Sequence, residues 1–197
     1  GGVVVAAASE ENTVVTNGMS YHDRSGTNAN SAYVVSVGPE DFGSSHPLAG
    51  VEFQRKLERA CYKKTGGYRA PVQKLSDFLN DRPSRSPGVV KPSYTGEVVY
   101  TSLSDILPNF VANGIKQSAA AFDRKLRGFM NPDALLTAVE SRTSSPVRIL
   151  RDEHYQSVSV KGLFPAGEGA GYAGGIVSAA VDGLRIAEQV SVEYSKK

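Results

Sequence analysis

Short β-rich runs and turn residues alternate over the first part of the chain. Val3–Ala8 and Thr13–Thr16 are rich in β-branched and small apolar residues, and the polar residues 9–12 separate them. Two such runs joined by a short polar stretch are typical of a hairpin. Asn17-Gly18 is a turn signal, and Ala32–Val37 is another β-rich run. The pattern predicts two or three antiparallel strands.

The middle of the chain changes to helical spacing. Apolar residues recur every three or four positions over residues 47–65 and again after Ser104, a residue suited to a helix N-cap. A shorter helix is predicted over Val72–Leu79, and Val98–Tyr100 has the composition of a short strand. We expect these helices to form an insertion of about residues 46–130 beside the sheet.

The last part of the chain has a different order. An apolar run, Gly162–Ala166, is followed by five glycines within Gly167–Gly175 and then by alanine-rich sequence of helical period. This order predicts a strand, a tight loop and a helix. We therefore expect an α+β fold, with a mixed or antiparallel sheet, a helical insertion and a closing strand–glycine loop–helix.

The glycine loop, residues 167–175, has a composition suited to a ligand. Glycines carry no Cβ, so the backbone can approach a ligand closely and can adopt a positive φ. The first N–H groups of the following helix are unpaired and carry partial positive charge, which suits an anion or an electron-rich carbonyl. Glu168 lies inside the loop and is suited to accepting hydrogen bonds from sugar or polyol hydroxyls.

Gly169, Gly171 and Gly174 also match the dinucleotide fingerprint G-x-G-x-x-G. That motif requires a second strand and an acidic residue about 20 residues further on. The sequence ends at Lys197, before a second strand of this kind. We therefore do not expect a self-contained Rossmann site here.

The segment GLFPAGEGAGYAGGIVSAAVDGLRIAE, residues 162–188, resembles the closing motif of FAD-dependent oxidoreductases. More narrowly, it resembles a family of bacterial NAD(P)/FAD-dependent dehydrogenases of unknown substrate. TNGMSYHDRSGTNANSA (16–32), HPLAGVEFQR (46–55), FDRKLRGF (122–129) and ESRTSSPVRILRDE (140–153) resemble the same family. The similarity extends over almost the whole chain.

The resemblance implies that residues 151–197 are the C-terminal segment of an FAD-binding domain and that residues 1–150 form a substrate or cap region. It implies hydride transfer through FAD, NAD(P) as a possible electron donor, and a small-molecule substrate. Family members carry a glycine-rich AMP-binding fingerprint in an N-terminal half, which is the expected partner of this chain. The fragment alone is expected to be inactive and to bind FAD poorly. The implied cofactor-binding residues are Gly167, Glu168, Gly169, Gly171, Tyr172, Ala173, Gly174, Gly175 and Ile176.

Three further residues are candidates for catalysis. His22 can act as a general acid or base near neutral pH, and Arg24 can hold a carboxylate or phosphate. Arg142 is followed by three hydroxyl side chains, a group that can stabilise a developing oxyanion. The alternative is that His22 and Arg24 are turn and surface residues, and that Arg142 pairs with a nearby carboxylate.

Composition favours an ordinary soluble protein. The formal net charge is +2, 21% of residues are charged, and no apolar run approaches the ~20 residues that cross a bilayer. Cys61 is the single cysteine, which indicates a core residue in a reducing cytoplasm. The three histidines are far apart and no metal-binding motif is present.

The alternative function is a binding module without catalysis. Residues 55–91 carry ten Lys or Arg against three acids, an excess that could attract RNA or an acidic protein. No aromatic interleaving or known RNA motif accompanies this excess, so we expect a solvated face and no nucleic acid.

Overall fold

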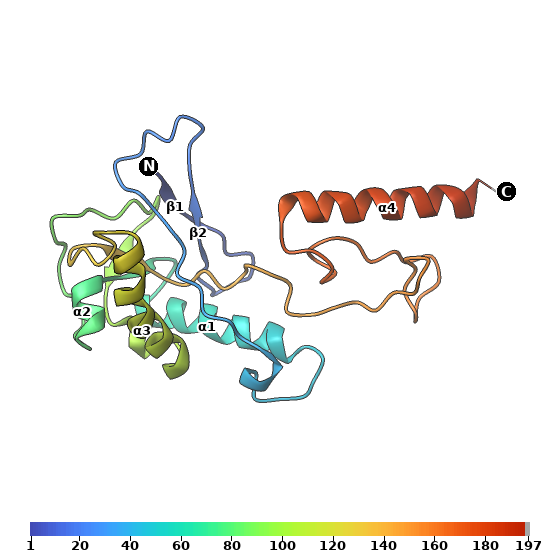
Figure 1. Ribbon diagram of the computed structural model, residues 1–197. Coiled ribbons are helices and arrows are strands. Elements are labelled where there is room, and N and C mark those ends of the chain that lie inside the picture. Colours follow the sequence, from blue (N-terminus) through green and yellow to red (C-terminus); the bar gives the residue numbers. More distant parts are fainter. Residues whose placement is uncertain (196–197) are drawn as a thin grey trace. The chain divides into compact units, whose positions relative to one another are not determined.

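The computed structural model describes residues 1–195, and the chain folds as two compact units (Figure 1). Unit 1 consists of residues 1–41 and 53–141. Unit 2 consists of residues 42–52 and the chain from 142 onward. The main division therefore lies at Ser141, somewhat before the predicted domain boundary at residue 150.

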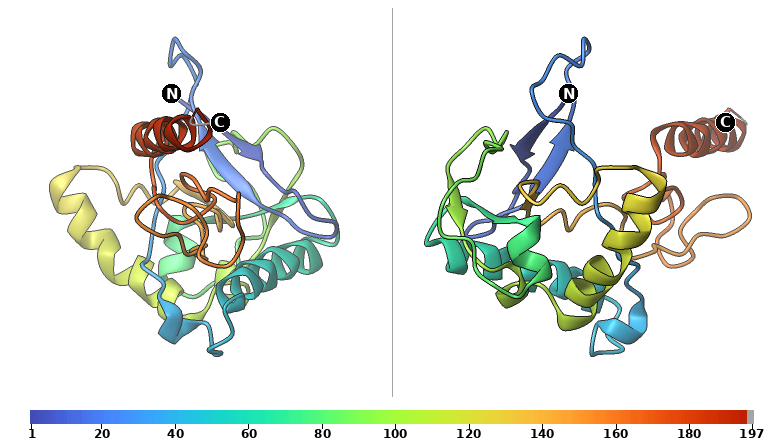
Figure 2. Two further views of the ribbon diagram at one scale, coloured as in Figure 1. Left: turned by 90° about the vertical axis from the view of Figure 1, so that its right-hand side faces the viewer. Right: turned by 60° about the vertical axis from the view of Figure 1, so that its left-hand side comes forward.

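Unit 1 opens with a two-stranded antiparallel sheet. β1 (Val3–Ala6) pairs with β2 (Thr16–Met19), and the two strands lie side by side in both views of Figure 2. The predicted hairpin is confirmed, but its second strand begins at Thr16 and contains Asn17-Gly18, so the predicted turn there is wrong. Residues 13–15 are instead buried, and the Val14 N–H donates to the Glu58 carbonyl over 3.1 Å.

A second sheet has three strands in the order β4-β3-β5. The central β3 (Ala70–Lys74) is parallel to β4 (Val98–Tyr100) and antiparallel to β5 (Leu135–Thr137). The predicted helix over residues 72–79 is therefore wrong in its first half, and only α2 (Leu75–Leu79) is helical. Pairing on both edges of β3, together with full burial of Val72, determines the strand.

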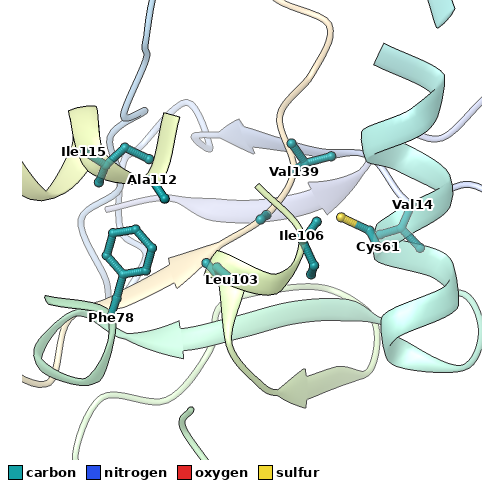
Figure 3. Packing of buried hydrophobic residues seen from close by; sticks show 9 residues of the cluster. Val14, Cys61, Phe78, Leu103, Ile106, Ala112, Ile115 and Val139 are labelled. Carbon is teal, nitrogen blue, oxygen red and sulfur yellow. The ribbon is translucent and has the colours of Figure 1, made fainter. Parts of the chain in front are cut away.

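The helices of unit 1 surround one apolar core. α1 (Ala49–Thr65), whose first residues belong to unit 2, ends where the helical spacing predicted for residues 47–65 ends, just before Gly66-Gly67. α3 (Asn109–Lys125) is one continuous helix after a short 3-10 turn at Leu103–Asp105. Residues 32–37 form no strand, contrary to expectation. The core contains Val14, Cys61, Phe78, Leu103, Ile106, Ala112, Ile115, Ala138 and Val139 (Figure 3). Burial raises the pKa of the Cys61 thiol to about 12, in keeping with its predicted core position.

Unit 2 contains one long helix, α4 (Ile176–Tyr194), which is uninterrupted in the views of Figures 1 and 2. The chain turns at residues 152–155, and Arg151 and Ser157 form an isolated antiparallel bridge around this turn. The predicted strand over Gly162–Ala166 is absent. No strand in the described part of unit 2 pairs with this run. Its carbonyl groups have other partners instead: the Leu163 carbonyl accepts from the Ser157 N–H over 2.7 Å, and the Pro165 carbonyl accepts from Arg151 over 2.8 Å. The α+β class, with small antiparallel and mixed sheets, is confirmed.

Candidate functional site: the glycine loop of unit 2

Two glycines of the loop are required by the fold of unit 2. Gly167 and Gly171 have φ values of 64° and 83°, which disfavour any residue with a side chain. A Cβ at Gly171 would also lie 2.4 Å from the Val147 carbonyl oxygen. These two positions fold the loop back against residues 147–149, where the Ile149 N–H donates to the Ala170 carbonyl over 3.2 Å.

Neither a positive φ nor close packing requires glycine at the other three positions of the loop. Gly169, Gly174 and Gly175 have no positive φ and are exposed. A Cβ at Gly169 would meet nothing within 4 Å. At Gly174 and Gly175 it would make ordinary contacts of 3.8 and 3.6 Å with the hydroxyls of Ser144 and Ser178. A side chain would therefore fit at each position as far as residues 1–195 are concerned.

The start of α4 is open. The exposed fraction of Ile176 is 92%. Within the described residues, the N–H groups of Ile176, Val177 and Ser178 have no hydrogen-bond acceptor. The Ser178 hydroxyl instead accepts from the Gly175 N–H over 3.2 Å. Free N–H groups at a helix N-terminus carry the positive end of the helix dipole.

A buried ion pair connects the loop to α4. Arg151 donates to both carboxylate oxygens of Asp182, over 2.9 and 2.6 Å. Asp182 Oδ2 also accepts from the Gly167 N–H over 2.8 Å, and Arg151 Nη1 donates to the Pro165 carbonyl over 2.8 Å. The hydrogen bonds from Arg151 and Gly167 lower the pKa of Asp182 to about 2.

Tyr172 is held inside unit 2. Its ring centroid lies 3.6 Å from the Arg151 guanidinium carbon and 5.0 Å from that of Arg148. Its hydroxyl accepts from the Arg151 N–H over 3.2 Å and donates to the Ile149 carbonyl over 3.1 Å. The side chain thus contributes to fixing the loop.

The predicted cofactor-binding residues form one continuous stretch of unit 2. Glu168 is exposed, its backbone carbonyl accepts from the Gly171 N–H over 2.9 Å, and its carboxylate contacts no partner among residues 1–195. Ala173 is half-buried between Tyr172 and the open glycines. The outward-facing part of the stretch therefore combines one carboxylate, three glycines and the free N–H groups of α4.

The predicted catalytic candidates lie in different units. His22 and Arg24 are exposed in the turn after β2 of unit 1. Arg24 has a φ of 53°, and its N–H donates to the Tyr21 carbonyl over 3.0 Å. Arg142 is the first residue of the second part of unit 2. Among residues 1–195, no three His, Cys, Asp or Glu side chains group together as metal ligands do.

Sequence reasoning missed the Arg151–Asp182 pair. Helical spacing predicts the helix that contains Asp182, but nothing in the pattern connects Asp182 to a residue 31 positions earlier. Opposite charges in sequence are too common for such a pairing to be predicted without the fold.

Comparison with known proteins agrees with the resemblance. A model of the family described as FAD-dependent protein, C-terminal domain-like, matches residues 1–143. The chain belongs to this family. The match contains all of unit 1 and ends before the glycine loop, so it is independent of the glycine motif.

The chain is also similar to an uncharacterized protein of Clostridium beijerinckii. The two are 53% identical over 195 residues, which cover 98% of this chain and 37% of the relative. The chain thus spans little more than a third of the relative's length. No helix within residues 1–195 has the length and apolar character needed to cross a membrane.

Proposed function

We propose that this chain is the C-terminal part of a flavin-dependent oxidoreductase, in which the glycine loop and the start of α4 contact FAD. One observation carries the proposal: Gly169, Gly174 and Gly175 are exposed glycines that neither backbone conformation nor packing within residues 1–195 requires. Their lack of side chains is explained if a ligand lies against the backbone. Membership of a family of FAD-dependent proteins supports FAD as that ligand.

The residues of the stretch suit a flavin. The free N–H groups of Ile176, Val177 and Ser178 form the positive end of α4, which suits a carbonyl edge that gains negative charge on reduction. The exposed Glu168 carboxylate would accept hydrogen bonds from ribityl hydroxyls. A carboxylate here disfavours a phosphate at the same place, so the pyrophosphate would bind elsewhere.

FAD would supply the redox chemistry, which we propose is hydride transfer, with NAD(P) as electron donor and a small molecule as substrate. The protein would orient the ring and stabilise its charge. His22, Arg24 and Arg142 remain the candidates for contacts with the substrate.

The exposed apolar side chains of α4 favour the presence of a further segment of the same protein that packs against this helix. Val177, Val181 and Leu184 follow one another on one face of the helix and are exposed, with Val177 at 75% and Leu184 at 65%. A face of this kind normally packs against a sheet or helix. We propose that it packs against an N-terminal FAD-binding part of a longer protein, since the relative extends well beyond the matched region.

The alternative of a basic binding module has less support. Lys64 forms an ion pair with Asp105, and Arg82 and Lys74 both pair with Asp77. These pairs reduce the positive field of residues 55–91 that would attract an acidic partner.

The substitution Gly169→Ala, which adds a methyl group, tests whether FAD contacts the loop. In the full-length protein without FAD, Gly169→Ala adds one atom that unit 2 accommodates freely, so the melting temperature should not change. If the flavin lies against this backbone, we expect at least a roughly tenfold loss of FAD affinity, measured by fluorescence titration.

Ala120→Ser is the matched control, because it adds one heavy atom at an exposed position of α3 in unit 1. It should leave FAD affinity unchanged. Wild-type FAD affinity in Gly169→Ala would contradict contact between the loop and the flavin. Absence of any bound flavin in the wild-type protein would contradict the proposed function as a whole.

A further inference from the structure

The Arg151–Asp182 pair contacts the glycine loop at its start and joins it to the second turn of α4. Asp182 accepts from the N–H of Gly167, the first glycine, and Arg151 donates to the carbonyl of Pro165 just before it. Arg151 also stacks on Tyr172, whose N–H donates back to the Gly167 carbonyl over 3.0 Å. One pair therefore restrains both sides of the turn from Gly167 to Tyr172.

The pair itself is shielded from any ligand. The exposed fractions of the Arg151 and Asp182 side chains are 10% and 12%. Within the turn that the pair restrains, by contrast, Glu168 and Gly169 are exposed. Any effect of the pair on a bound flavin must therefore pass through the loop.

We propose that Arg151 and Asp182 are a positioning pair that sets the place of the glycine loop relative to the N-terminal turn of α4, and thereby tunes the reduction potential of the flavin. This inference rests on the proposed function. It concerns two residues that touch neither cofactor nor substrate.

The charges of the pair are needed for this role. The Asp182 carboxylate accepts three hydrogen bonds, two from Arg151 and one from Gly167. An asparagine has one accepting oxygen, so it cannot satisfy Arg151 in the same bidentate geometry and Gly167 together. Removing one partner also leaves a nearly buried charge without compensation. The loop is then free to shift relative to the free N–H groups of Ile176–Ser178.

The direction in which the flavin's midpoint potential should shift follows from the position of the α4 N-terminus. The α4 N-terminus stabilises negative charge on the reduced ring only while the loop holds the ring close to it. A displaced loop weakens this stabilisation. The midpoint potential of the flavin should therefore become more negative.

The experiment compares Asp182→Asn with wild type in the full-length, flavin-loaded protein. We expect a more negative midpoint potential, a shifted visible absorbance spectrum, and a roughly tenfold loss of FAD affinity for the loss of one charge-assisted hydrogen bond. Glu153→Gln is the matched control, because it removes a carboxylate from the same unit at a side chain that is 88% exposed. It should leave potential and spectrum unchanged.

Arg151→Lys is the second variant, for use if Asp182→Asn does not fold. Lysine keeps the charge but loses the planar fork and the stacking on Tyr172. It should shift the potential in the same direction by a smaller amount.

The outcomes separate the two hypotheses. A wild-type protein that binds FAD, with variants that lose thermal stability but keep its potential and spectrum, overturns the positioning role and leaves the proposed function intact. A wild-type protein that binds no flavin overturns both.

Discussion

Gly171 and Gly169 lie two residues apart in the same loop, but different constraints act on them. Gly171 combines a φ of 83° with a position where a Cβ would lie 2.4 Å from a carbonyl oxygen. Gly169 has neither constraint. The sequence shows both only as glycines within a motif. The structure separates the glycine that unit 2 requires from the one that we assign to a ligand.

Gly171→Ala should therefore disrupt the loop even without a cofactor. A side chain in the left-handed region costs on the order of 1–3 kcal/mol, and the close carbonyl adds to this. Hydrogen exchange of residues 167–172 in the FAD-free full-length protein should increase strongly for Gly171→Ala. It should remain at the wild-type level for Gly169→Ala. Equal exchange in the two variants would contradict the different roles assigned to these glycines.

The pKa of Asp182 predicts how the contribution of the Arg151–Asp182 pair to stability depends on pH. Its folded-state pKa is about 2, below the ordinary value of 3.8, because Arg151 and the Gly167 N–H stabilise the carboxylate. A lowered pKa contributes stability that is fully present above the ordinary value and is lost as pH falls toward the folded value. The stability difference between wild type and Asp182→Asn should therefore be constant from pH 5 to 8 and shrink below about pH 4.

Chemical unfolding of both proteins across this range provides the measurement. A difference that varies between pH 5 and 8 would show that another group governs the contribution of the pair.

At the scale of elements, the sequence predicted correctly those helices and strands that the local pattern of apolar and polar residues determines. The helix ending at Gly66-Gly67 and the strand Val98–Tyr100 were predicted correctly. β3 was missed because Val72–Lys74 continues into the helix α2 without a turn signal, and only pairing with β4 and β5 makes it a strand. The apolar run Gly162–Ala166 was predicted as a strand, yet no strand within the described residues of unit 2 pairs with it.

The absent strand and the exposed face of α4 have a common explanation. Both include apolar side chains that the described part of unit 2 leaves exposed, such as Leu163 at 43% and Leu184 at 65%. In the proposed longer protein, Gly162–Ala166 could pair with a sheet that the N-terminal part supplies. The sequence pattern would then describe the complete protein better than it describes this chain.

Leu184→Asp tests the exposed face of α4. In the full-length protein a charge in a packed apolar interface is costly, so we expect weaker flavin retention and a lower melting temperature. Val89→Asp is the control, because Val89 is 86% exposed in a loop of unit 1. Thermal unfolding and flavin content should distinguish the two variants. Equal behaviour would indicate that this face of α4 is exposed in the complete protein as well.

At the scale of the whole molecule, the family match and the loop that we propose contacts FAD lie in separate regions of the chain. The family match covers residues 1–143, whereas the glycine loop begins at residue 167. The family could be inferred from sequence because its motifs are long and spread along the chain. The Arg151–Asp182 pair could not be inferred, because it depends on a tertiary contact between distant positions.

The most direct test of the central claim is amide hydrogen exchange of the full-length protein with and without FAD. We predict that FAD protects Gly169 and the first turn of α4, residues 176–178, whose N–H groups have no acceptor among residues 1–195. The exposed turn after β2 at residues 20–24 provides an internal comparison. Bound FAD that leaves exchange at residues 169 and 176–178 unchanged would contradict the claim that this loop and helix end contact the flavin.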